Sequence, residues 1–403
     1  MKRLIRAVSV VLAALCLLIL GACVYVGQTT PDAMNVSTRS PVCCDNLYSL
    51  SFPDSTFADG TGKYTETTAQ MKLLDIIPVK DVKVTLSERQ SVITGGQPFG
   101  IRLYTEGLII SRISSVQTSG GKITPADDAG LKCGDVILQA NGNELKTNEQ
   151  LLQLCHESKG DPVLLHCIRD GKSFNTSITP VKDSSQGTYR LGIWVRDSCA
   201  GIGTITFIDP MTKCFAGLGH GIYDGESGSL MPLADGDIVP ADIISVDKGA
   251  GGRPGSLSGC FITGEPLGVL SANTECGLYG SYNKAASGEK TEIAFRQEVM
   301  RGSAVILSTV EGSTPKAYDI EIENISYDTG SPSKNMVIRI TDKELIKKTG
   351  GIVKGMSGSP ILQNGRLVGA VTHVFIDDPT HGYGVFAENM AEECNKTVQN
   401  LAA

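Results

Sequence analysis

The chain has 403 residues, enough for two or three domains that each bury a core. Its composition, with 41% hydrophobic residues, 5% aromatic residues and 46 glycines, is typical of a soluble β-rich protein and not of a helical bundle or a disordered chain. The formal charge of −7 is spread along the chain without a basic stripe, which excludes nucleic acid as an expected partner.

Residues 1–27 are predicted to form a transmembrane signal anchor. The uncharged run Ala7–Val26 is long enough, as a helix, to cross a bilayer core of about 30 Å. Lys2, Arg3 and Arg6 precede it, so the positive-inside rule predicts that the rest of the chain is exported. The run ending at Cys23 also resembles a bacterial lipobox, which leaves cleavage and acylation at Cys23 as the alternative.

Residues 28–75 are rich in Thr, Ser, Asp and Gly and are predicted to be a linker. The chain has 12 cysteines, whose spacing follows no known disulfide framework; adjacent Cys43 and Cys44 are the pair we most expect to be oxidised. No CxxC or Cys/His cluster has the spacing of zinc ligands, so we predict neither a metal site nor another cofactor.

Residues 76–183 are predicted to form a PDZ domain with a preceding strand. The segment Pro125–Gly142 resembles a PDZ domain, since Ala129-Gly130-Leu131 closes a short helix and Val136-Ile137-Leu138 enters a strand. Thr147 and Gln150 then form a capping box for the next helix.

PDZ domains bind an extended peptide between such a helix and a strand edge, with the peptide carboxylate at backbone amides. The resemblance makes Phe99-Gly100-Ile101 the candidate amide loop. Another copy of the chain is one candidate source of the peptide.

The region 188–403 contains the predicted chemistry. Gly355-Met356-Ser357-Gly358-Ser359-Pro360 has the form G-x-S-G-x-P, the nucleophile turn of chymotrypsin-like peptidases. Glycines on both sides of Ser357 let the backbone offer the amides of Gly355 and Ser357 to an oxyanion. A glycine-rich turn with a surface serine is the structural alternative.

A serine hydroxyl needs a neighbouring base, and the chain has five histidines. His220 follows apolar strand material well before the serine, a placement that suits a base on one barrel facing a nucleophile on the other. His156 and His166 fall in the PDZ region, and His381 lies in a glycine-rich loop. His373 suits the wall of a substrate pocket and is the alternative base.

These motifs resemble the stage IV sporulation protein B peptidases, and the similarity covers residues 75 to 395. The order of anchor, linker, PDZ domain and peptidase matches as well. The resemblance implies a mainly β fold with a chymotrypsin-like double β-barrel, and it places the family's histidine and serine at His220 and Ser357. The segments that carry it are Leu191–Asp197, Ala200–Thr204, Gly219-His220, Gly350–Pro360 and Thr372–Phe375.

The family's acidic residue falls at Asp342, which the resemblance implies would orient His220. Chymotrypsin-like enzymes place that aspartate much further from the serine, so Asp224 and Asp242 remain alternatives. A helix N-cap before Lys343-Glu344-Leu345-Ile346 is the structural interpretation of Asp342.

The expected function is that of a sporulation serine endopeptidase without a cofactor. By resemblance, it is exported from the forespore, cleaves itself, and cuts a membrane-bound regulator of an intramembrane protease to activate a late mother-cell sigma factor. It would act on protein at a membrane surface, from the inner forespore membrane and facing the intermembrane space. The alternatives are a tethered PDZ adaptor without activity and an envelope quality-control protease, in which the PDZ domain normally follows the peptidase.

Overall fold

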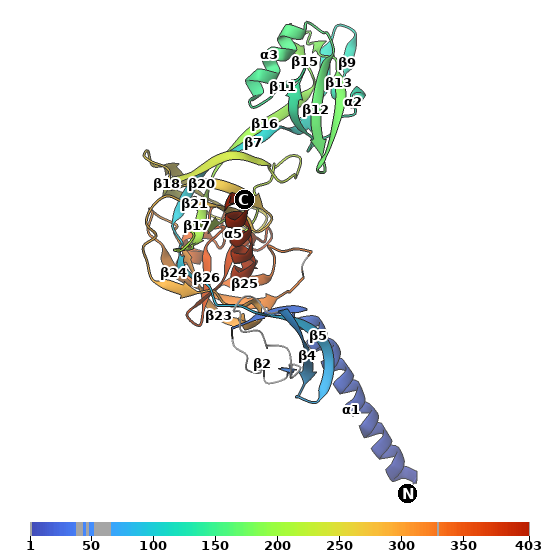
Figure 1. The fold of residues 1–403 in the computed structure, drawn as a ribbon, viewed down its shortest axis with the longest axis vertical. Helices are drawn as coiled ribbons and strands as arrows, with labels where there is room; N and C mark the ends of the chain where they lie inside the picture. Colours follow the sequence, from blue (N-terminus) through green and yellow to red (C-terminus); the bar gives the residue numbers. More distant parts are fainter. Residues whose placement is uncertain (1, 38–42, 46–47, 52–65, 329, 403) are drawn as a thin grey trace.

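The computed structural model describes residues 2–37, 43–45, 48–51, 66–328 and 330–402. The molecule is elongated: an N-terminal helix and small sheet lie at one end, the barrels in the middle, and the PDZ domain at the other end (Figure 1). Helix α1 (Lys2–Thr29) includes a stretch, Ile5–Gln28, that is long and apolar enough to cross a membrane.

The predicted linker 28–75 is not supported, because its described parts belong to a folded sheet. Five strands pair in the order β1-β5-β4-β3-β2. Buried apolar residues alternate with polar ones along β4 and β5, and Val26 of α1 joins their core. Because only every second residue of a strand faces this small core, the segment as a whole has a polar composition, which explains the incorrect prediction. The strands are β1 (Ala33–Val36), β2 (Cys43–Asp45), β3 (Tyr48–Ser51), β4 (Glu66–Leu73) and β5 (Ile77–Leu86). The side chains of Cys43 and Cys44 lie outside the described part.

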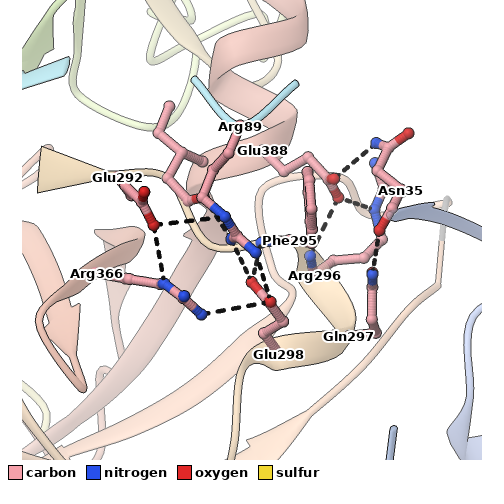
Figure 2. Close-up of polar contacts among 10 residues, drawn as sticks. Asn35, Arg89, Glu292, Phe295, Arg296, Gln297, Glu298, Arg366 and Glu388 are labelled. Carbon is pink, nitrogen blue, oxygen red and sulfur yellow. Dashed lines mark hydrogen bonds and ion pairs between the residues drawn. The ribbon is translucent and has the colours of Figure 1, made fainter. Parts of the chain in front are cut away.

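Polar side chains connect this sheet to the barrels (Figure 2). The Asn35 amide donates to the buried carboxylate of Glu388, 2.7 Å away, and Gln297 donates to the carbonyl of Asn35. Glu388 also pairs with Arg296. The sheet is therefore docked on the peptidase region by a charged, largely buried cluster.

Six strands form the first barrel, because their pairings close a ring in the order β7-β18-β20-β21-β17-β16 and back to β7. Its core contains Phe99, Ile205 and Phe215. The strands are β7 (Pro98–Ile113), β16 (Ile193–Ile208), β17 (Cys214–Gly217), β18 (Leu233–Asp247), β20 (Gly268–Thr274) and β21 (Gly277–Tyr282). At the margins lie β6 (Ser91–Thr94), β19 (Ser256–Phe261), β22 (Lys290–Glu292) and the 3-10 turn η1 (Arg296–Glu298).

The PDZ domain is inserted into this first barrel. The long strands β7 and β16 leave the barrel side by side and continue into the PDZ domain (Figure 1). The predicted boundaries 76–183 for the PDZ domain and 188–403 for the peptidase are therefore wrong at the start of the PDZ range. There, β6 and the first part of β7 pair with strands of the peptidase. The capping box of Thr147 and Gln150 is confirmed at α3. The inserted elements are β8 (Val116–Thr118), β9 (Gly121–Ile123), α2 (Pro125–Asp128), β10 (Val136–Ala140), β11 (Asn143–Glu144), α3 (Asn148–Ser158), β12 (Val163–Arg169), β13 (Lys172–Ile178), β14 (Val181–Lys182) and β15 (Tyr189–Arg190).

The second barrel is closed in the order β23-β24-β25-β28-β27-β26. Helix α5 (Ala387–Ala402) packs across both barrels, and a disulfide joins its Cys394 to Cys214 of β17. The expected mainly β fold with an apolar N-terminal helix, a PDZ domain and a two-barrel peptidase is confirmed. The elements are β23 (Gly302–Ser308), β24 (Lys316–Ile325), β25 (Met336–Ile340), α4 (Lys343–Thr349), β26 (Pro360–Gln363), β27 (Arg366–Val374) and β28 (His381–Phe386).

Candidate active site

His220 is carried by the loop that follows β17 of the first barrel. Leu218 and Gly219 both have positive φ and turn the chain out of the strand. A Cβ atom on Gly219 would lie 3.0 Å from the Thr372 side chain of the other barrel, so a larger residue would crowd the junction and would also be strained by the positive φ. The histidine is thereby held at the junction of the barrels.

The ring of His220 is oriented by its own backbone. Its Nδ1 lies 2.8 Å from the carbonyl oxygen of Gly221. A carbonyl only accepts hydrogen bonds, so Nδ1 carries the proton and Nε2 has a free lone pair. Burial lowers the pKa of His220 despite the opposing effect of this hydrogen bond, which keeps the ring neutral and able to take a proton near pH 7.

Ser357 is carried by a tight turn between α4 and β26 of the second barrel. Gly355 and Gly358 have φ values of 100° and 92°, in the region that favours glycine. A Cβ atom on Gly358 would lie 2.1 Å from the carbonyl oxygen of Thr204. The hydroxyl of Ser357 donates to the carbonyl of Thr372, 2.8 Å away.

The turn leaves two backbone amides available. Within the part of the chain that the structure describes, the N–H groups of Gly355 and Ser357 have no hydrogen-bond partner. They are the pair that the sequence predicts for an oxyanion hole.

Two threonines of β16 hold the nucleophile turn from the first barrel. The Thr204 hydroxyl donates to the carbonyl of Gly355 at 3.0 Å, and its N–H donates to the carbonyl of Ser357. The Thr206 hydroxyl donates to the carbonyl of Gly358 at 2.8 Å. Sequence analysis assigned neither threonine a role, although Thr204 ends one of the segments that carry the family resemblance.

Ser357 and His220 line one cavity of about 550 Å³ at the junction of the barrels. Aliphatic side chains from both barrels form most of its wall, including Ile101, Ile202, Leu218, Ile352, Val353 and Val374. His373 also lines the cavity, and its ring centroid lies 4.6 Å from that of His220. The position of His373 in the pocket wall agrees with the sequence analysis.

The structure does not place Asp342 beside His220, contrary to the prediction that this carboxylate orients the base. Asp342 is the N-cap of α4, and its Oδ1 accepts the N–H of Leu345 at 2.8 Å. Asp224 is buried in an ion pair with Arg196. Among the described residues, no aspartate is hydrogen-bonded to His220.

The other histidines lie away from this cavity. His166 contacts Asn175 in the PDZ domain, and His381 contacts Asp378. His156 lies in α3. In the described ranges, no group of three or more His, Cys, Asp or Glu side chains is arranged to hold a metal ion.

Phe99-Gly100-Ile101 is not the amide loop of the PDZ domain. These residues are buried in β7, where they pair with both β16 and β18, and Ile101 lines the catalytic cavity instead. The apolar glycine-containing triplet resembles an amide loop locally, but barrel pairing buries it.

A different segment lies beside α3. Residues 189–195 and α3 line a cavity of about 540 Å³, with Leu151 and Cys155 on the helix side. Gly192 has a φ of 71°, and a Cβ atom there would lie 2.5 Å from the carbonyl of Ser114. This segment then continues into β16 and the first barrel.

Two six-stranded barrels with a serine and a histidine at their junction define the class of two-barrel serine peptidases. The family model for the SpoIVB peptidase S55 matches residues 187–391, more than half of the chain. The chain therefore belongs to the SpoIVB peptidase family, as the sequence analysis expects, and a PDZ domain model matches residues 107–179.

Other similar proteins cover parts of the chain. A putative zinc metalloprotease of Lactococcus lactis, LL2128, is 42% identical over 72 residues, which are 18% of this chain and 16% of that protein. The PDZ domain of the SdrC-like protein of Listeria monocytogenes is 25% identical and covers 22% of this chain and 87% of its own, with a TM-score of 0.19. The Rv3671c protease of M. tuberculosis, in an inactive form, is 15% identical and covers 49% of this chain and 84% of its own, with a TM-score of 0.28.

Proposed function

We propose that this chain is a membrane-anchored serine endopeptidase that acts through an acyl-enzyme on Ser357, with His220 as its base. The observation that carries the proposal is the position of both residues in one largely aliphatic cavity between two barrels. The two unpaired amides of the nucleophile turn support it further.

The mechanism begins with rotation of the Ser357 hydroxyl from the carbonyl of Thr372 to Nε2 of His220. His220 takes the proton while Oγ attacks the peptide carbonyl, and the resulting oxyanion accepts hydrogen bonds from the N–H groups of Gly355 and Ser357. His220 returns the proton to the leaving amine, and water then hydrolyses the acyl-enzyme by the same route. The role of Asp342 as third member of the triad would require movement of α4 or of the His220 loop.

Membership of the SpoIVB peptidase family supports a proposed biological role. In this proposal the peptidase is exported from the forespore, anchored by α1 in the inner forespore membrane, and faces the intermembrane space. It cleaves itself and a membrane-bound regulator of an intramembrane protease, which triggers activation of a late mother-cell sigma factor. The positive charges before the apolar run of α1 support this orientation.

The PDZ domain is proposed to bind a peptide between α3 and residues 189–195. The cavity there has an aliphatic floor and backbone amides at Leu191 and Gly192 that suit a carboxylate. The peptide comes from the substrate or from another copy of the chain.

The peptidase proposal is tested with the full chain in detergent, beside its Ser357→Ala and His220→Ala variants. Fragments are followed by intact mass, and Ser357 is labelled with a fluorophosphonate. Each substitution should reduce turnover by a factor on the order of 10⁶. Ser359→Ala is the matched control, because this buried serine is bonded to Ser308 and does not line the cavity. Equal cleavage in all four proteins would contradict the assignment, and intact parent protein without labelling would favour an adaptor.

A further inference from the structure

His373 occupies a place beside the base that no established or proposed role explains. It is at the end of β27, directly after Thr372, whose carbonyl holds the Ser357 hydroxyl. Its ring lies 4.6 Å from that of His220, with an angle of 34° between the two planes. Two consecutive residues of one strand therefore contact both the nucleophile and the base.

We propose that His373 is a positioning residue: its neutral ring packs on the ring of His220, fixes its orientation, and stabilises the imidazolium that forms when His220 takes the proton of Ser357. The inference rests on the proposed peptidase function and deepens it.

The groups bonded around His220 do not supply a negative charge to stabilise its imidazolium form. Its Nδ1 is bonded to the neutral carbonyl of Gly221, and Asp342 is used as a helix cap. In the part of the chain described, no carboxylate contacts the imidazole. An aromatic face attracts a cation more strongly in a desolvated site than in water, and His220 lies in such a site.

His373 can act in this way only if it stays uncharged. Burial, and then the proximity of His220 and Lys334, lowers the pKa of His373 to about 4. His220 approaches it from the loop after β17, and Lys334 from the segment before β25. The ring of His373 is therefore neutral near pH 7.

The cost of placing a histidine here also points to function. Nδ1 of His373 is buried and, within the described residues, has no hydrogen-bond partner. An unpaired buried polar atom destabilises a fold, so a residue chosen only for packing would be apolar. Packing alone therefore does not account for a polar ring here, and the comparison of Phe and Leu variants separates its aromatic face from its nitrogens.

The test compares two variants. His373→Phe keeps an aromatic face, whereas His373→Leu keeps apolar volume but has no aromatic face. We expect kcat of the Phe variant to stay within about 3-fold of the parent and that of the Leu variant to fall about 5- to 30-fold. His373→Met replaces Leu if the Leu variant does not fold, as judged by thermal melting.

A second readout does not depend on activity. The pKa of His220 is measured by NMR of histidine-labelled full chain in a Ser357→Ala background, where five histidines make assignment by substitution practical. The pKa of His220 should be lower in the Leu variant than in the Phe variant, since the imidazolium loses its aromatic partner.

Equal kcat and equal His220 pKa in the Phe and Leu variants would overturn the proposal. Equal loss of kcat in both would overturn it as well, because it would assign the role to the ring nitrogens of His373. If the parent shows no proteolysis that depends on Ser357, the proposed function fails, while the titration still decides whether the two rings interact.

Discussion

The Ser357 hydroxyl donates its hydrogen bond to the carbonyl oxygen of Thr372, 2.8 Å away, and not to His220. His220 is similarly held by the carbonyl of Gly221. Nucleophile and base therefore share a cavity, yet each is bonded to backbone. In the proposed mechanism the serine hydroxyl turns from this carbonyl towards His220, so the groups that hold the nucleophile turn should influence turnover.

Thr204 is expected to be such a group. Thr204→Val keeps the shape of this buried side chain but removes the hydroxyl that donates to Gly355. We expect a loss of about 1 kcal/mol in the free energy of unfolding. A displaced turn should also lower kcat/KM by about 10- to 100-fold. Thr204→Ser, which restores the hydroxyl, should recover both values, and parent-like kinetics in the Val variant would show that this bond does not position the turn.

Asp342 is expected to act on stability as the cap of α4. Asp342→Ala should cost about 1 kcal/mol, whereas Asp342→Asn keeps a capping oxygen and should leave the melting temperature close to that of the parent. Thermal unfolding of both variants measures this difference. A large loss of proteolysis in the Asn variant at unchanged melting temperature would instead mean that the carboxylate reaches His220 in another conformation.

The free energy of unfolding should decrease as the pH is lowered from about 6.5 to about 4. An unfolded histidine binds its proton below about pH 6.5, whereas the pKa of folded His373 is about 4 because of burial. Between these values the unfolded chain binds more protons, so acid favours unfolding, by on the order of 3 kcal/mol once the pH is below 4. Denaturant unfolding at pH 7 and pH 4.5 should show a smaller decrease for His373→Phe than for the parent. An identical decrease in both proteins would place the proton uptake elsewhere.

Trp194 should report occupancy of the PDZ cavity. It is the single tryptophan of the chain, is 54% exposed, and lines the cavity with Leu152. A peptide with an apolar C-terminal residue and a free carboxylate should shift its fluorescence to shorter wavelength, and the amidated peptide should bind more weakly.

The matched variants for this cavity are Leu152→Glu and Leu164→Glu. Both leucines are about half exposed, but Leu164 lies on β12, outside the cavity. Leu152→Glu should abolish the fluorescence response and Leu164→Glu should preserve it. A response that survives Leu152→Glu would place the peptide at another surface.

Features that are encoded in contiguous residues could be predicted without the structure. The apolar run of α1, the helix and strand pattern of the PDZ domain, and the glycine turn around Ser357 are local patterns with local physical causes. His220 was identified because few histidines compete for the role of base. These parts were enough to identify the family.

The structure was needed to show which separate segments come together. Phe99-Gly100-Ile101 forms barrel wall because β16 and β18 pair with it from positions more than 90 residues away. His373 lies against His220, and Thr204 against the nucleophile turn, because two barrels meet there. Pairing between distant strands depends on register and burial along the whole chain, which no short motif records.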